Sequence, residues 1–206
     1  GKDFWTTRDS IAAPYIKKPE NYGTQLQFMG PSNKFLNYSL QVNREKGSTW
    51  FSALGFSTTY MATANFSPRE NLNFSLMYQH SSEDDWLNWI EDNLLGIYTN
   101  RQRTTVASMN WFKGDQHEVR IKAQMVAFTA RAPRAYLGDS SGSLNPTEVA
   151  LQPFSLSDLA FQIRYRYELL PLAYLYVVYS KGGRIVEFDE EDSLGKLYPG
   201  YYTHLR

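Results

Sequence analysis

The chain has 206 residues, and its 21 basic and 21 acidic side chains sum to a formal charge of zero. This length suits one good-sized domain or part of a larger one, and the charge balance gives no support for nucleic-acid binding. Because the chain contains no cysteine, disulfide frameworks and cysteine-ligated metals are excluded.

No apolar run approaches the roughly 20 residues that a membrane-spanning helix requires. A membrane β-barrel is not excluded, because its strands are apolar on one face only. Aromatic residues make up 16% of the chain, a high content that suits the two interfaces of a bilayer. The chain begins with Gly-Lys rather than Met, so we expect a mature piece or a fragment of a longer protein.

Alternation of apolar and polar residues with a period of two dominates the chain and predicts β-strands. The clearest case is 158–168, where aliphatic and aromatic residues alternate with glutamine, arginine and glutamate. The pattern predicts a single domain with eight strands, near 22–29, 35–43, 50–66, 72–80, 102–112, 117–127, 158–168 and 173–180.

The connections between these strands are mostly short at one end of the predicted sheet and long at the other. Long external loops are predicted at 81–101, 129–157 and 181–200. This asymmetry, together with strands of about ten residues, is typical of outer-membrane barrels. We therefore predict an all-β fold, an antiparallel up-and-down transmembrane β-barrel whose eight strands form part of a larger barrel.

A soluble β-sandwich would show the same alternation, so it is the position of the charged residues that distinguishes a membrane barrel from a sandwich. Each Arg or Lys on the lipid face near the bilayer midplane costs roughly 2–4 kcal/mol. The alternation places several charged residues together, and we predict that they face a wet lumen: Arg120, Lys122, Arg164, Arg166, Glu118 and Glu168. This group could attract an anionic solute, or it could form a paired lattice that stiffens the wall.

Two segments resemble a known family of large Gram-negative outer-membrane proteins. In FWTTRDSIAAPYIKKPENYGTQLQF (4–28), an arginine and an Ala-Pro pair precede Lys-Pro and a strand. In FSLSDLAFQIRYRYELLPLAYLYVVYSKGG (154–183), a strand rich in arginine and aromatics leads through a proline turn to a second strand. Members of this family carry an N-terminal carbohydrate-binding module of the family-nine type and a C-terminal barrel domain of unknown function. The resemblance implies an outer-membrane barrel with a link to glycans through a module that this chain lacks.

No catalytic motif is present, and the three histidines are not at metal-ligand spacing, so we expect no enzyme activity. Acidic side chains cluster in two predicted loops, where they could bind calcium: Asp84, Asp85, Asp189 and Glu190. Solvation at the cell surface is the simpler role for them. Trp86 and Trp89 could stack on sugar rings or anchor the barrel mouth.

The leading hypothesis is an outer-membrane barrel that passes, binds or displays material at the surface of a Gram-negative bacterium. Its expected partners are outer-membrane lipid and other barrel-associated or periplasmic proteins, with no nucleic acid. No cofactor is expected apart from calcium at the loops. The alternatives are a secreted carbohydrate-binding β-sandwich and a glycoside hydrolase that uses loop carboxylates.

Overall fold

The computed structural model describes residues 20–30, 33–47 and 54–188, and every regular element among them is a β-strand. In this part of the chain, no helix is long and apolar enough to cross a membrane. The nine strands are β1 (Tyr22–Met29), β2 (Leu36–Lys46), β3 (Phe56–Arg69), β4 (Leu72–Glu91), β5 (Leu94–Lys113), β6 (His117–Gly138), β7 (Leu144–Thr147), β8 (Phe154–Leu170) and β9 (Ala173–Glu187).

All nine strands belong to one antiparallel sheet in which each long strand pairs with its neighbour in the chain. The order is β1-β2-β3-β4-β5-β6-β8-β9, and the short β7 pairs with the far end of β6. Tight turns join the long strands at one end. In the β5–β6 turn, Gly114 has φ 58°, a value that suits a residue without a Cβ atom. The predicted all-β, up-and-down fold is confirmed.

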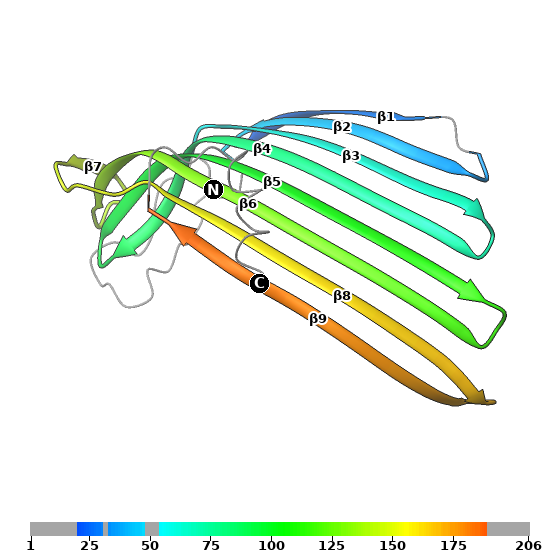
Figure 1. Ribbon diagram of the computed structural model, residues 1–206. Coiled ribbons are helices and arrows are strands. Elements are labelled where there is room, and N and C mark those ends of the chain that lie inside the picture. The colour runs from blue at the N-terminus through cyan, green and yellow to red at the C-terminus, as the bar shows by residue number, and fades with distance from the viewer. Residues whose placement is uncertain (1–19, 31–32, 48–53, 189–206) are drawn as a thin grey trace.

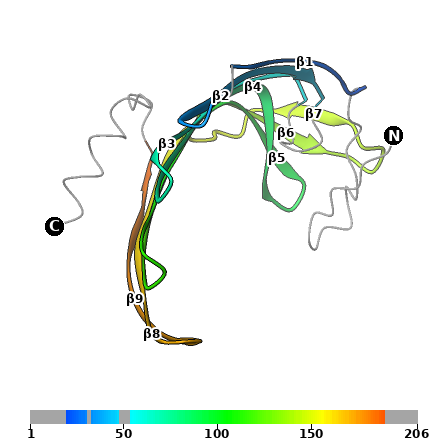
Figure 2. The same ribbon diagram turned by 90° about the vertical axis from the view of Figure 1, so that its right-hand side faces the viewer.

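The sheet is bowed, and β1 and β9 lie at opposite ends of the bow (Figures 1 and 2). Among the described residues, these two outer strands do not pair with each other, so the sheet is open. Each outer strand has one paired edge and one unpaired edge. The structure is consistent with a portion of a barrel wall.

Strand positions were predicted better than strand lengths. The predicted bounds 22–29 match β1, but β3 begins at Phe56 rather than at residue 50, and residues 50–53 lie outside the described part. The predicted loops 81–101 and 129–157 are wrong in large part. β4 and β5 extend through the first to a tight turn at 92–93, and β6, β7 and β8 occupy much of the second. Of the predicted loop 181–200, β9 takes the residues up to Glu187, and those from 189 onward lie outside the described part.

The extended ends of these strands contain a small hydrophobic core. Leu87, Leu95 and Ile97 are buried and contact the partly buried Leu54, Tyr136 and Leu144. The strand ends fold toward the inner side of the bow (Figure 2). This packing explains why these segments were wrongly predicted as loops. Residues that pack into a local core at the strand ends need not alternate between apolar and polar along the strand.

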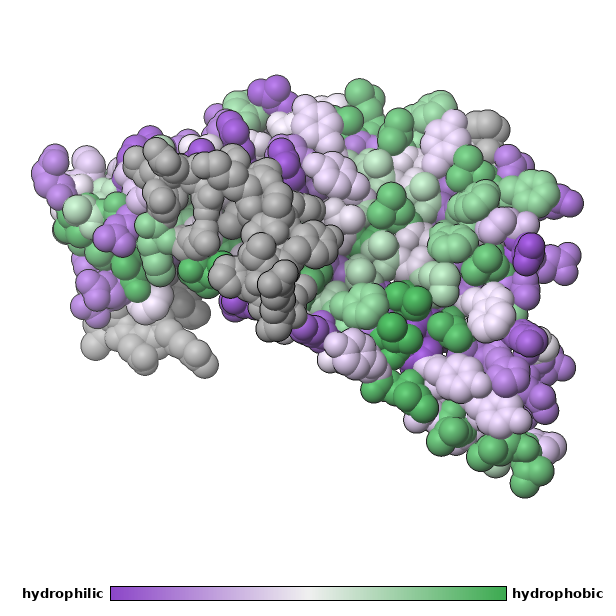
Figure 3. Space-filling view, in the orientation of Figure 1, coloured by the Kyte–Doolittle hydropathy of each residue, from purple (hydrophilic) through white to green (hydrophobic). Residues whose placement is uncertain are grey.

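The two faces of the sheet differ sharply in polarity. Cross-strand partners lie on the same face, so the register defines one apolar face over the turn-side half of the sheet. We call these residues the apolar belt: Leu26, Phe28, Leu36, Tyr38, Leu40, Val42, Tyr60, Ala62, Ala64, Phe66, Leu72, Phe74, Leu76, Tyr78, Thr105, Ala107, Met109, Trp111, Val119, Ile121, Ala123, Met125, Leu159, Phe161, Ile163, Tyr165, Val177 and Tyr179. The belt lies on the convex side of the bow, where apolar residues are spread over the surface (Figure 3).

Candidate functional site

The charged residues of β6 and β8 face one another across the concave side of the sheet. Glu118 is opposite Arg166, Arg120 is opposite Arg164, and Lys122 is opposite Gln162. Glu168 follows Arg166 by two positions and lies opposite Tyr174. The register thus brings together all six residues that the sequence predicted to face a lumen, and we call them the charged wall.

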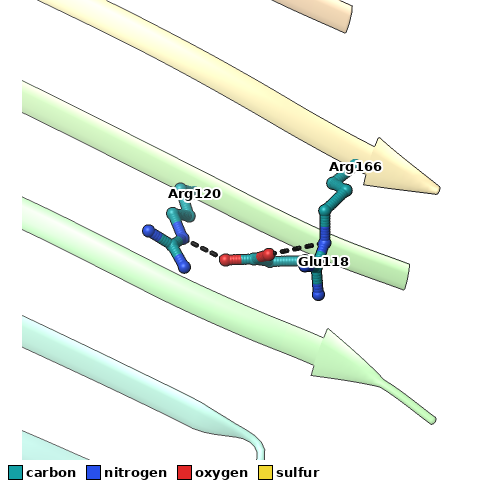
Figure 4. Close-up of polar contacts among 3 residues, drawn as sticks. All are labelled: Glu118, Arg120 and Arg166. Carbon is teal, nitrogen blue, oxygen red and sulfur yellow. Dashed lines mark hydrogen bonds and ion pairs between the residues drawn. The ribbon is translucent and has the colours of Figure 1, made fainter. Parts of the chain in front are cut away.

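Glu118 is the centre of the charged wall. It is only 1% exposed, and its two carboxylate oxygens form ion pairs with two arginines from different strands (Figure 4). Arg120 Nε contacts Oε1, and Arg166 Nε lies 2.9 Å from Oε2. Because each carboxylate oxygen has a cationic partner, the two ion pairs offset the cost of removing this charged group from water.

Two tyrosines of β9 complete the charged wall, and the sequence analysis did not identify them. The guanidinium of Arg164 lies 5.2 Å from the ring centre of Tyr176, and that of Arg166 lies 5.0 Å from the ring centre of Tyr174. Both are cation–π distances. The first eight residues of β9, AYLYVVYS, are mostly apolar or aromatic on both faces, so the sequence alone did not show which aromatic residues would meet the arginines. The position of the tyrosines two residues apart was the available signal.

The rest of the concave face is polar but largely neutral. On β1 to β5 it carries mainly Asn, Gln, Ser and Thr, with hydrogen bonds such as Ser39 Oγ to Thr63 Oγ1 at 2.7 Å. On β9, both Nε and Nη2 of Arg184 donate to the carboxylate of Asp158, at 2.7 and 2.9 Å. Charge is therefore concentrated on one side of the concave face, where four cations of the charged wall face two carboxylates.

A second buried acid, Glu83, was placed in a loop by the sequence analysis and lies instead on β4. It faces the concave side, is 1% exposed, and accepts a hydrogen bond from Asn100 Nδ2 at 3.3 Å. Burial raises the pKa of Glu83 to about 7, and the hydrogen bond from Asn100 opposes this rise. Glu83 lies five positions beyond Tyr78, the last belt residue of β4, and so outside the apolar belt.

Trp86 and Trp89 were predicted to lie in a loop, but both belong to β4, where their surroundings differ. Trp86 belongs to an aromatic cluster with Tyr98, Phe128 and Phe154, at ring-centre distances of 5.2 to 6.4 Å. Trp89 is 44% exposed, and its Nε1 donates to the carbonyl oxygen of Asp92 at 3.0 Å. Of the pair, Trp89 is the one that presents a largely open ring.

The candidate calcium ligands are not assembled into a site in the part that the structure describes. Asp85 forms an ion pair with Arg134, and Asp84 is exposed, while Asp189 and Glu190 lie outside the described residues. Over 20–30, 33–47 and 54–188, no group of three or more His, Asp or Glu side chains is arranged to hold a metal ion.

The charged wall therefore offers guanidinium and ammonium groups beside tyrosine rings on a concave polar surface. Such a surface can attract anions and stack against flat or sugar-like solutes. No protein-family model, no curated protein and no solved structure matches this chain.

Proposed function

We propose that this chain forms part of the wall of an outer-membrane β-barrel of a Gram-negative bacterium. Its role in that barrel is the passage, binding or display of material at the cell surface. The observation that carries the proposal is the apolar belt: a continuous convex surface on eight paired strands that contains no charged side chain at the belt positions.

The belt is too large and too exposed for a surface in contact with water. Leu26 is 69% exposed, Leu76 49% and Val177 56%, and many other large apolar side chains of the sheet are exposed to a similar extent. Exposed apolar patches beyond a few hundred Å² mark sites that another apolar phase or partner covers. On β4 the belt extends from Leu72 to Tyr78, and on β8 from Leu159 to Tyr165, about 20 Å of extended chain. Strands of an outer-membrane barrel are tilted by roughly 35–45°, so this stretch spans about 15 Å of an apolar band that is roughly 25 Å tall.

A β-sandwich would need a second sheet packed on the belt. The described residues form a single sheet, and their buried hydrophobic core lies at the strand ends instead of under the belt. Hydrocarbon chains of a bilayer are the covering that this arrangement suits best. The charged wall then lies on the opposite, water-filled side, where its cost is small.

The resemblance of 154–183 to family segments with a barrel domain supports the same proposal, since this stretch forms the β8–β9 hairpin. It also supports a link between the barrel and glycans. The polar concave face, with tyrosines beside arginines, suits an anionic or sugar-containing solute better than an apolar one.

Folding in detergent tests the membrane proposal. We expect the chain to need detergent or lipid for a monodisperse product, and to migrate faster on gels when unheated than after boiling. A chain that folds cooperatively as a soluble monomer without detergent would contradict the proposal.

The proposed passage of anions is tested on the complete barrel. The double variant R164E/R166E reverses charge on the concave face, and K34E reverses charge at a tight turn as a control. We expect the first to shift ion selectivity in planar bilayers toward cations and the second to leave it unchanged. Equal selectivity in both variants would argue against a solute path along the charged wall.

A further inference from the structure

The two faces of the sheet differ in charge as well as in polarity. The difference is found in the paired stretches 22–29, 36–46, 56–66, 72–82, 101–112, 117–129, 155–168 and 173–186. All four carboxylates in them lie on the concave face: Glu45, Glu118, Asp158 and Glu168. The convex face carries no carboxylate in these stretches, but it carries five cations: Arg44, Lys46, Arg101, Arg103 and Lys181. One acidic position follows at the end of β9, where Glu187 is opposite Ser155 in the convex register.

These five cations, which we call the basic row, all lie at the same border of the apolar belt. Arg44 is two positions beyond Val42, Arg103 is two positions beyond Thr105, and Lys181 is two positions beyond Tyr179. In each case the cation is on the side away from the tight turns. Counted from the tight turns, each cation therefore comes after the last belt residue of its own strand, although Lys181 is also directly opposite the belt residue Phe161 of β8.

The turn side of the belt has a different character. The tight turns carry charges of both signs: Lys34, Arg69, Glu70, Lys113 and Asp115. A general need for solubility would place mixed charges at both borders. A border at which cations predominate on one side, five against the one acidic position of Glu187, points to a negatively charged partner at that side.

Two members of the basic row are open to such a partner. Arg44 and Arg101 are exposed, and Arg44 lies 5.0 Å from the ring centre of Phe56, with the Lys46 ammonium 5.6 Å from the same ring. Within the described residues, no carboxylate forms an ion pair with Arg44, Lys46, Arg101 or Arg103. On the concave face, by contrast, Arg120, Arg166 and Arg184 each have an acidic partner.

We propose that the basic row binds the phosphate groups of anionic lipids in the leaflet at the far ends of the strands. This inference rests on the proposed membrane location of the belt. Cations at the border of an apolar surface lie at the depth of lipid headgroups, and their aliphatic stems can remain in the hydrocarbon. Guanidinium groups bind phosphate through paired hydrogen bonds, which favours the three arginines as the main contacts.

Lipid selectivity tests the proposal. The chain is folded into phosphatidylcholine vesicles, and the association of spin-labelled phosphatidylglycerol is compared with that of spin-labelled phosphatidylcholine. We expect a several-fold preference for phosphatidylglycerol that weakens as salt is added. R101E/R103E should reduce this preference to near one, so that the two lipids associate equally, and R101Q/R103Q should reduce it less. The control K34E/K113E, at the tight turns, should retain it.

Failure of this inference is distinct from failure of the membrane proposal. A wild-type chain that inserts but shows no preference between the two lipids would overturn the lipid inference alone. So would an inserted Gln or Glu variant that keeps the full preference. A chain that inserts into neither kind of vesicle would overturn the membrane location itself, and with it the leaflet that the inference requires.

Discussion

At the scale of single residues, Glu118 links two strands through one carboxylate. It contacts Arg120 on its own strand and Arg166 on β8, while Arg164 lies directly opposite Arg120. Without the carboxylate, three guanidinium groups would stand close together on a concave surface. The ion pairs thus stabilise the sheet mainly by reducing the repulsion among the three guanidinium groups. Contacts between arginine and tyrosine alone would not remove this repulsion.

We predict that E118Q lowers the free energy of unfolding by about 1–3 kcal/mol, the range for hydrogen bonds to charged groups. Removing Arg166 as well should recover part of this loss, because the repulsion falls with the number of cations. A double-mutant cycle of E118Q and R166Q, measured by urea unfolding in detergent micelles, gives the coupling. Additive effects within about 0.5 kcal/mol would contradict a direct interaction.

Glu83 gives stability a dependence on pH. Its pKa is raised from 4.5 to about 7 by burial, so the protonated form is the one that the fold favours. The contribution is fully present below pH 4.5 and is lost as the pH rises through about 7. We predict that the wild-type chain loses up to about 3 kcal/mol between pH 5 and pH 8, whereas E83Q shows a flatter profile. Parallel profiles for the two proteins would exclude this role.

Asp139 shows the opposite shift in the turn between β6 and β7. Its Oδ1 accepts hydrogen bonds from the Ser141 hydroxyl at 2.6 Å and from the backbone amides of Ser141 and Ser143 at 2.8 and 3.0 Å. These bonds lower the pKa of Asp139 to about 2. The stabilisation of this turn is therefore present above about pH 4 and is lost as the pH falls through 2.

We expect amide exchange at Ser141 and Ser143 to remain slow down to about pH 3 after correction for the intrinsic rate. In D139N, the same amides should exchange faster at neutral pH, because a neutral amide oxygen is a weaker acceptor than a carboxylate. Nuclear magnetic resonance can follow both amides. Unchanged protection in D139N would show that the backbone alone holds the turn.

At the scale of elements, the turn-side half of each strand could be predicted from the sequence. There one face is apolar and the other is polar along the whole length, so the residues alternate regularly. Leu36, Tyr38, Leu40 and Val42 alternate with polar residues for that reason, and the predicted strand was found. The clustering of the charged wall was predictable on the same ground. The far halves were not, since five consecutive residues of β5, 94–98, are buried and therefore show no alternation between apolar and polar positions. The sequence also did not reveal the tyrosine partners on β9, which depend on strand register.

A matched pair of variants on β5 tests which face meets lipid. Ala107 lies in the centre of the belt, and Ser108 is its neighbour on the concave face, opposite Lys122. We predict that A107R lowers the free energy of unfolding in bilayers by about 2–4 kcal/mol, as for an arginine near the bilayer midplane. S108R should cost well under half as much, apart from its repulsion with Lys122. Similar costs at both positions would be inconsistent with one wet and one lipid-covered face.

At the scale of the whole molecule, the open sheet is the feature that decides how the chain can function. The paired strands β1 to β9 have neither a closing partner nor a covered edge among the described residues. An exposed edge in hydrocarbon leaves backbone groups without hydrogen bonds, at several kcal/mol for each group. Within a membrane, this wall is therefore stable only where further strands pair with both edges. The belt, the charged wall and the open edges are together consistent with the proposed role as a portion of a barrel wall.

The absence of cysteine from the chain allows the closure to be tested by cross-linking. Gln162 and Ser180 lie directly opposite each other on β8 and β9, so Q162C/S180C should form a disulfide and serves as the positive control. A series that combines S180C with single cysteines at Gln25, Gln27 or Met29 on β1 should form no disulfide within one chain, because further strands separate the two edges. An efficient disulfide in any member of the series would instead mean that these strands close on themselves, and the lumen would then be narrow and filled by side chains.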